Sequence, residues 1–296
     1  MTTWSTYLIA KSIDEALEAL ASSPEPSYPV GGGTDLLLEL QQGLKPAVHT
    51  LVDLTHIPEL TLLEERADHL FIGAAVPITK IVESPLVRFH APAVTEACNL
   101  IGGPQVRNTA TLGGNVAHAL PAADGMISLV AMDAVAEIAS RNGFRREPVL
   151  NLFVGPGVSA LELGKEIISG FYLPLRKHNQ ASAFSRVMRP QGVALPIINM
   201  AVWIERAGDL IQDIRIAIGP SGPTPKRAQD VEEYLKGKSP LEDNLAQAHE
   251  VMNETVRFRT SAKRATAEYR YILGGYLLVD VICKAWKRAE EVRKDD

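Results

Sequence analysis

The stretch Pro29-Val30-Gly31-Gly32-Gly33-Thr34-Asp35-Leu36 decides the fold class of this chain. Short apolar residues from Tyr28 lead into three consecutive glycines, and residues 35–42 then follow a helical pattern. Glycine lacks a Cβ and permits positive φ angles, so successive N–H groups of such a loop can converge on an anion. The loop is not a Walker A sequence, because no Gly-Lys-Ser/Thr follows, and it lacks the Gly-x-Gly-x-x-Gly spacing of a Rossmann turn.

A second glycine loop, Thr111-Leu112-Gly113-Gly114-Asn115, follows about eighty residues later. Either loop alone is also compatible with an ordinary turn. Together they predict a ligand with two phosphates, held from both sides. We expect Gly32→Val to fill the space that the pyrophosphate needs and to disfavour a positive φ at Gly32.

The residues around the first loop predict an α/β unit over residues 1–60. Residues 13–20 have apolar side chains at helical spacing after Ser12, a plausible N-cap. Residues 50–54 form an apolar run typical of a buried strand. A strand, a glycine loop, a helix and a second strand in this order indicate half of a nucleotide-binding fold.

A second unit is expected over residues 61–176. Residues 69–75, 134–140 and 166–173 are predicted strands, and helices are predicted over 77–83, 91–101 and 125–132. Residues 148–164 are rich in proline and glycine and are expected to be irregular. The polar residues 176–180 most resemble a linker.

A third unit, residues 181–296, has a different pattern. Strands are expected over residues 183–187, 199–204 and 211–218, the last with alternating apolar and polar residues. Long helical patterns fill residues 227–235, 241–257 and 262–290. This order predicts an α+β domain, with helices on one face of an antiparallel sheet.

Composition excludes several classes of protein. The 296 residues are 46% hydrophobic and 22% charged, as in ordinary globular proteins, and the net charge of −5 argues against nucleic acid as the main partner. We find no secretory signal and no apolar run of membrane-spanning length, so the expected location is the cytoplasm. Cys98 and Cys283 are too few to hold an iron–sulfur cluster. An electron-transfer role would therefore require an organic cofactor.

Four separated motifs carry a family resemblance. They are residues 30–36 (Val-Gly-Gly-Gly-Thr-Asp-Leu), residues 71–75 (Phe-Ile-Gly-Ala-Ala), residues 105–115 (Gln-Val-Arg-Asn-Thr-Ala-Thr-Leu-Gly-Gly-Asn) and residues 121–124 (Pro-Ala-Ala-Asp). In this order they resemble the FAD-binding subunit of molybdenum hydroxylases, the group that includes carbon monoxide dehydrogenase, 4-hydroxybenzoyl-CoA reductase and xanthine dehydrogenase. Residues 218–228 and 267–270 are similar to the C-terminal domain of that family. The resemblance covers essentially the whole chain.

The resemblance implies a fold, a cofactor and partners. The implied fold is an FAD-binding domain of the vanillyl-alcohol-oxidase type in two α/β subdomains, followed by a C-terminal α+β domain. FAD would be bound non-covalently. A molybdopterin-binding large subunit and a small subunit with [2Fe–2S] clusters would be its partners, commonly in a heterohexamer. FAD would pass electrons from the clusters to an external acceptor, which could be NAD⁺, a quinone, a ferredoxin or oxygen. The cysteine-bearing insertion of 4-hydroxybenzoyl-CoA reductase is missing here, which indicates the ordinary members of the family.

The resemblance also implies which residues bind the cofactor. The first loop matches the family's pyrophosphate loop, and the second loop would add hydrogen bonds from the Thr111 hydroxyl and the Asn115 amide. Asp124 would accept hydrogen bonds from cofactor hydroxyl groups, or alternatively cap the helix that starts at Gly125. Ile101 and Ser169 lie where relatives touch the cofactor. Arg186 replaces a lysine found near the flavin in many relatives, so it could either serve the flavin or be a solvated strand residue. The complete predicted set is Pro29, Val30, Gly31, Gly32, Gly33, Thr34, Asp35, Leu36, Ile101, Thr111, Leu112, Gly113, Gly114, Asn115, Asp124, Ser169 and Arg186.

We assign no catalytic acid or base and no metal ligand on this chain. His118 follows the second loop and could suggest covalent flavin attachment, but relatives have varied residues there. His49, Asp53 and His56 do not converge on one side of a strand. Two other functions remain open: a free-standing flavin oxidoreductase of the same fold, which would need its own acid or base above the flavin, and a non-redox nucleotide-binding module.

Overall fold

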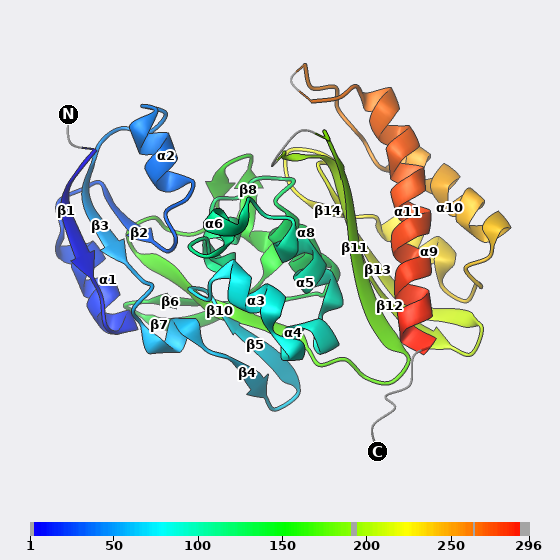
Figure 1. Cartoon of the computed structure of the whole chain (residues 1–296), viewed down its shortest axis with the longest axis horizontal. Helices are drawn as coiled ribbons and strands as arrows, with labels where there is room; N and C mark the ends of the chain where they lie inside the picture. The colour runs from blue at the N-terminus through cyan, green and yellow to red at the C-terminus, as the bar shows by residue number, and fades with distance from the viewer. Residues whose placement is uncertain (1–2, 191–193, 263, 291–296) are drawn as a thin grey trace.

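Three sheets of three or more strands follow one another along the described part of the chain (Figure 1). The structure is a computed structural model that describes residues 3–190, 194–262 and 264–290. The first sheet lies at one end of the molecule, the second in the middle, and the third at the other end with the long helix α11 (Ala267–Glu290) in front of it. The chain thus has the mixed helix and sheet composition expected from its sequence.

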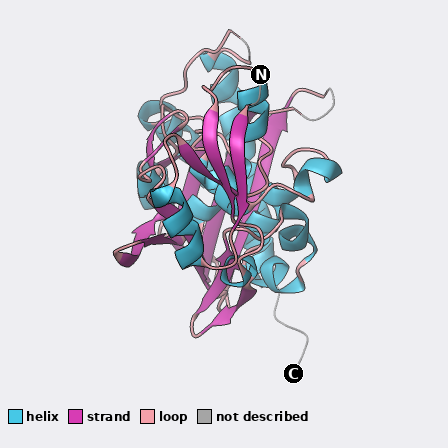
Figure 2. Cartoon of the chain, turned by 90° about the vertical axis from the view of Figure 1, so that its left-hand side faces the viewer, coloured by secondary structure: helices cyan, strands magenta, loops and turns pink. Residues whose placement is uncertain are grey.

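The first sheet is parallel, in the order β1 (Trp4–Ile9), β3 (Val48–Asp53), β2 (Ser27–Val30), and faces the viewer in Figure 2. Helix α1 (Ile13–Ser22) begins at Ser12, whose hydroxyl accepts a hydrogen bond from the N–H of Glu15. The first glycine loop connects β2 to the short helix α2 (Leu36–Gln41). These elements confirm the predicted strand, loop, helix and strand. Strand β1 was not predicted, because this edge strand is largely exposed and has no apolar alternation.

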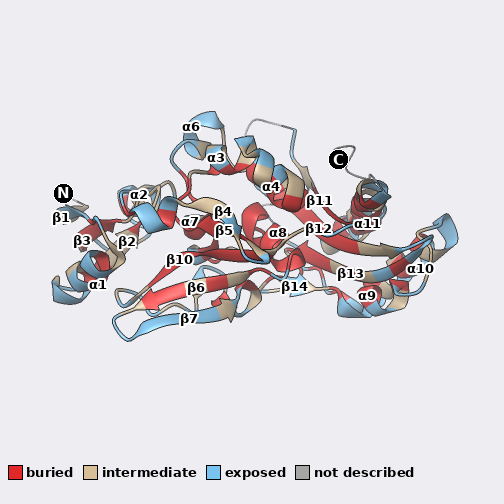
Figure 3. Ribbon diagram, turned by 90° about the horizontal axis from the view of Figure 1, so that it is seen from below, coloured by how far each residue is buried: buried red, intermediate tan, exposed pale blue. Residues whose placement is uncertain are grey.

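The second sheet is antiparallel. Its order is β4 (Leu63–Arg66), β5 (His69–Gly73), β10 (Glu166–Pro174), β6 (Val135–Ser140), β7 (Gly143–Pro148). The central strand β10 comes from the far end of this unit and pairs with both β5 and β6. Strand β7 was missed by the sequence patterns, because it is exposed along its length and rich in charged residues (Figure 3).

Short helices fill the connection between β5 and β6. They are α3 (Ile78–Glu83), α4 (Pro85–His90), α5 (Pro92–Asn99), α6 (Pro104–Arg107), α7 (Leu112–Ala117) and α8 (Asp124–Ala131). Proline opens α4, α5 and α6, where its missing N–H costs no hydrogen bond. Short 3₁₀ turns occur at Pro58–Thr61 and Val149–Leu152, and a small hairpin joins β8 (Phe153–Gly155) to β9 (Val158–Ser159). The expected irregular stretch therefore contains local structure.

The third sheet is antiparallel, in the order β11 (Gln180–Met188), β12 (Pro196–Ala207), β13 (Leu210–Gly219), β14 (Lys226–Arg227). Helices α9 (Gln229–Leu235), α10 (Glu242–Thr255) and α11 share a core with one face, as predicted. The other face packs on α5 and α8 of the middle unit. The expectation of helices on one face alone is therefore corrected. The first nine residues of β12 are buried, because both of its faces are covered (Figure 3).

The predicted linker is part of this junction. Gln180 already belongs to β11, and the guanidinium of Arg176 donates to the main-chain oxygens of Gln180 and Arg288. Within the described residues, no helix combines the length and the apolar character that a membrane crossing requires.

Candidate functional site

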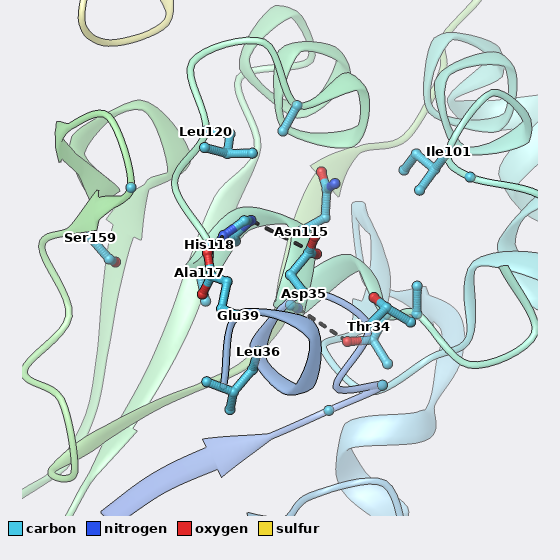
Figure 4. A pocket seen from close by; sticks show the side chains of 18 of the residues that line it. Thr34, Asp35, Leu36, Glu39, Ile101, Asn115, Ala117, His118, Leu120 and Ser159 are labelled. Atoms are coloured by element: carbon cyan, nitrogen blue, oxygen red, sulfur yellow. Dashed lines mark hydrogen bonds and ion pairs between the residues drawn. The ribbon is translucent and has the colours of Figure 1, made fainter. Parts of the chain in front are cut away.

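A cavity of about 820 Å³ brings the two glycine loops together. It lies between the first sheet, the helices of the middle unit and the start of the third sheet. Figure 4 shows side chains that line part of it. Its volume is in the range of small-molecule sites. The predicted residues that line it are Pro29, Val30, Gly31, Gly32, Gly33, Thr34, Asp35, Leu36, Ile101, Thr111, Gly114, Asn115, Asp124 and Arg186. Leu112, Gly113 and Ser169 do not line it.

The first loop has a row of unused hydrogen-bond donors. Within the described part of the chain, the main-chain N–H groups of residues 31–35 donate to no protein acceptor, although all five residues line the cavity. Unpaired N–H groups are costly unless water or a ligand accepts their hydrogen bonds. The loop therefore fits a group that carries several acceptor oxygens, as a pyrophosphate does.

The structure explains the need for glycine in this loop differently from the sequence analysis. Gly33, not Gly32, has the positive φ, at 66°. A Cβ on Gly32 would lie 2.0 Å from the main-chain oxygen of Thr109, and one on Gly31 would lie 2.7 Å from Thr111 Oγ1. Gly31 and Gly32 are thus needed for the close approach of the first loop to residues 109–111. The predicted positive φ at Gly32 was wrong.

The second loop is the first turn of helix α7 rather than a free loop. The Thr111 hydroxyl caps this helix by accepting the N–H of Gly114. The N–H of Gly113 donates to Ala74, and a Cβ on Gly113 would collide with that residue, so Gly113 faces away from the cavity. Leu112 is fully buried in the core. The Thr111 hydroxyl proton and the Asn115 amide N–H₂ remain available to a ligand.

Asp124 and Arg186 form a buried ion pair at another part of the cavity wall. The guanidinium contacts one carboxylate oxygen, while the amide of Asn199 donates to the other at 2.7 Å. The side chains of Asp124 and Arg186 are only 5% and 6% exposed, so Arg186 is not a solvated strand residue. Helix α8 begins after Ala123 without a side-chain cap, so the alternative role of Asp124 as a cap is also excluded.

The charge of this pair depends on pH. Burial raises the pKa of Asp124 to about 6, although Arg186 and Asn199 act in the opposite direction. The pair is neutral when Asp124 is ionised and carries one positive charge when it is protonated. The cation predicted beside the cofactor is therefore largely neutralised above this pKa.

Ile101 and Ser169 occupy different environments. Ile101 extends into the cavity, as do Asn115 and Leu120 from two other segments (Figure 4). Ser169 is buried in strand β10, where its hydroxyl donates to the main-chain oxygen of Glu137. Because its side chain is used inside the sheet, Ser169 lies outside the cavity wall.

A charged group beside the first loop was not predicted. His118 Nε2 lies 3.0 Å from Glu39 Oε1 (Figure 4). Lys45 Nζ lies 3.0 Å from Glu39 Oε2. Burial opposes ionisation of Glu39, but the hydrogen bonds from His118 and Lys45 outweigh it and hold the pKa of this carboxyl below its ordinary value. Helical spacing places Glu39 on the same face of α2 as Asp35, which is the signal that could have identified it.

The apolar part of the wall was also missed. It comes from the hairpin region with Val158, Leu161 and Leu163, and from Leu195 near the start of β12. Arg264, from the segment before α11, completes the wall. These residues are distant in sequence from both glycine loops and follow no motif, so only the tertiary structure could bring them to the site.

Sequence comparisons identify two domains. Residues 3–176 match the FAD binding domain in molybdopterin dehydrogenase, and residues 182–285 match the CO dehydrogenase flavoprotein C-terminal domain.

Full-length relatives agree with this division. The nicotine 6-hydroxylase medium subunit of Paenarthrobacter nicotinovorans is 33% identical, over 95% of this chain and 97% of its own length. The xanthine dehydrogenase FAD-binding subunit of Escherichia coli O157:H7 is 30% identical, over 95% and 96%. Among solved structures, a chain of carbon monoxide dehydrogenase from Hydrogenophaga pseudoflava superposes with a TM-score of 0.90 at 27% identity, covering 96% of this chain and 98% of that one.

The free amides of the first loop, the donors of the second loop and the apolar wall fit FAD, the ligand named for the matched domain. The chain belongs to the family of FAD-binding medium subunits of molybdenum hydroxylases, which are oxidoreductases.

Proposed function

We propose that this chain binds FAD non-covalently in the cavity and carries electrons from a [2Fe–2S] partner to an external acceptor. The observation that supports this most is that five consecutive residues lining a cavity of about 820 Å³ have main-chain N–H groups without a protein acceptor. The chemistry supplied there is that of a flavin, which exchanges electrons singly or in pairs. A molybdopterin-binding chain would oxidise the substrate of the complex.

The protein's own residues hold and orient the cofactor in this proposal. The amides of residues 31–35 and the Thr111 hydroxyl would bind the pyrophosphate oxygens. The Asp124 carboxylate would accept hydrogen bonds from cofactor hydroxyl groups, with Arg186 and Asn199 fixing its position. Leu120, Leu161 and Leu195 would exclude water from the ring systems. No acid or base is required, because electron transfer to an external acceptor breaks no bond in the protein.

We expect His118→Ala to keep the same flavin as the unchanged chain, because we assign His118 to a charged contact with Glu39 rather than to a covalent bond. Acid denaturation of both proteins should release all of the yellow cofactor, and chromatography should identify it as FAD. Flavin that stays with the denatured unchanged chain but is released from His118→Ala would contradict non-covalent binding. A colourless protein that takes up no FAD would contradict the proposed function itself.

The electron path can be tested in the assembled complex. We expect dithionite-reduced iron–sulfur clusters to be reoxidised by NAD⁺, a short-chain ubiquinone or oxygen only when FAD is present. The matched sample is the same complex after FAD is removed by dialysis against concentrated bromide and then restored. Recovery of visible absorbance at the cluster bands measures the rate. Equal reoxidation with and without FAD would contradict the path, and the acceptor that reacts fastest would identify the outlet.

A further inference from the structure

One face of helix α11 is apolar yet exposed. Tyr269, Ile272, Tyr276 and Val279 are 47%, 68%, 68% and 41% exposed. Their spacing of three, four and three residues places them in one line along the helix, over about 15 Å. The opposite face of α11 is buried against the third sheet. Large apolar side chains gathered on a surface commonly mark an interface.

A group of arginines lies at the start of this line. Arg257, Arg259 and Arg264 come from the segment before α11, and Arg270 lies in its first turn. Within the described residues, none of the four contacts a carboxylate. The Arg270 residue is only 4% exposed; its guanidinium donates to the main-chain oxygen of Arg259, and its Nε has no partner.

The positive charge of this group is not neutralised by an ion pair among the described residues, although Glu268 lies in the same first turn of α11. Burial, together with the nearby charges of Arg264 and Arg259, lowers the pKa of Arg270. The whole chain has a net charge of −5, so the arginines form a local positive region on an acidic protein. An anionic partner would relieve the repulsion between them and gain affinity from it.

The same region reaches the cavity. Arg264 belongs to the arginine group and also lines the cavity wall. A chain seated over α11 and these arginines would therefore lie beside the proposed cofactor site. Because the rate of electron transfer falls steeply with distance, the chain that delivers electrons must dock near this cavity.

We propose that the outer face of α11 and the accessible arginines before it, Arg257, Arg259 and Arg264, form the docking surface for an acidic, partly apolar face of the iron–sulfur partner. This inference rests on the proposed function and adds the surface and the chemistry of its partner. Tyrosine and arginine are the residues that most often supply binding energy in interfaces. A line of side chains about 15 Å long fits a protein surface rather than a small anion.

A second copy of this chain fits the surface less well. Lys284 is paired with Asp280 on α11, but the exposed Lys287 has no ion pair among the described residues, so positive charge lies at both ends of this face. Pairing two such faces in either direction would bring like charges together, which is unfavourable.

The test compares tagged full-length chains expressed in the native host. The variants are Arg257→Glu/Arg259→Glu, which reverses exposed charge outside the cavity, and Ile272→Glu, which places a charge in the apolar line. Leu241→Asp is the matched control, since Leu241 is 66% exposed on another helix and aspartate is favoured at its N-cap position. Bound FAD is measured after acid release, and the co-purified iron–sulfur chain by electron paramagnetic resonance and by mass spectrometry.

We expect the amount of iron–sulfur chain that co-purifies with each of the two variants to be lower than with the unchanged chain by a factor of about ten or more. FAD content should match that of the unchanged chain, and Leu241→Asp should behave normally. The affinity of the unchanged chain for the iron–sulfur chain should fall as salt is added. The affinity of the double variant should change less with salt. Full retention of the iron–sulfur chain in both variants would overturn the docking surface but leave the proposed function intact.

Two other results are distinguishable. An unchanged chain that holds FAD but brings down no iron–sulfur chain would refute the proposed function and this inference together. The unchanged chain could instead form a dimer that the variants lose, while the variants still bind the iron–sulfur chain. That result would overturn the inference in favour of a second copy.

Discussion

Replacing Gly32 by alanine or valine is expected to abolish FAD retention and to destabilise the chain. Even the alanine Cβ would lie 2.0 Å from the Thr109 oxygen and 2.7 Å from the Ala110 Cα, so the main chain must move. Such overpacking costs about 1–3 kcal/mol, and sometimes more. The move would separate residues 31–35 from residues 109–111 and thereby spread the donors that face the cavity. We expect the larger loss of stability for valine.

Gly155→Ala is the matched control for this substitution. Gly155 lies near the cavity in strand β8, and a Cβ there would meet nothing within 4 Å. The ratio of FAD to protein measures binding, and urea unfolding of the FAD-free proteins measures stability. Stoichiometric FAD in Gly32→Ala would contradict the close contact between the loops. Equal stability of Gly32→Val and Gly155→Ala would contradict the steric argument.

Replacing Arg186 by methionine is expected to lower the free energy of unfolding by about 3–5 kcal/mol at neutral pH, because it leaves a buried carboxylate without its cation. Adding Asp124→Asn should recover part of this loss, since the second change removes the buried charge. Arg141→Met is the control, because its pair with Glu18 is about two-thirds exposed on both sides and such pairs contribute less than about 1 kcal/mol.

The pH dependence follows from the direction of the Asp124 pKa shift. The folded-state pKa of about 6 exceeds the ordinary value of 3.8, so the native state holds the extra proton between these values. The contribution of Asp124 to stability is therefore present below pH 4 and is lost as the pH rises through 6. In Arg186→Met the pKa should rise further, and the loss should extend to higher pH. Urea unfolding from pH 4 to 8 measures this slope. If the unfolding free energy of the Asp124→Asn/Arg186→Met variant depends on pH in the same way, the pH dependence must come from another group.

The amino-acid sequence alone determined many of the helices, strands and loops of this protein, because these depend on neighbouring residues. The first glycine loop between a strand and a helix, the helix that begins at Ser12, and the alternation of residues 211–218 each follow from the conformational preferences of neighbouring residues. The motifs in their order also indicated the family that the comparisons identify.

The tertiary structure decided what depends on residues distant in the chain. It showed that Gly32 is required by the main chain of Thr109, and that Gly113 turns away from the cavity toward Ala74. It paired Arg186 with Asp124, sixty-two positions away in the sequence, and it brought Leu195 and Arg264 to the same cavity. Close approach, burial and pairing of charge are properties of packed segments, so no local pattern could have predicted them.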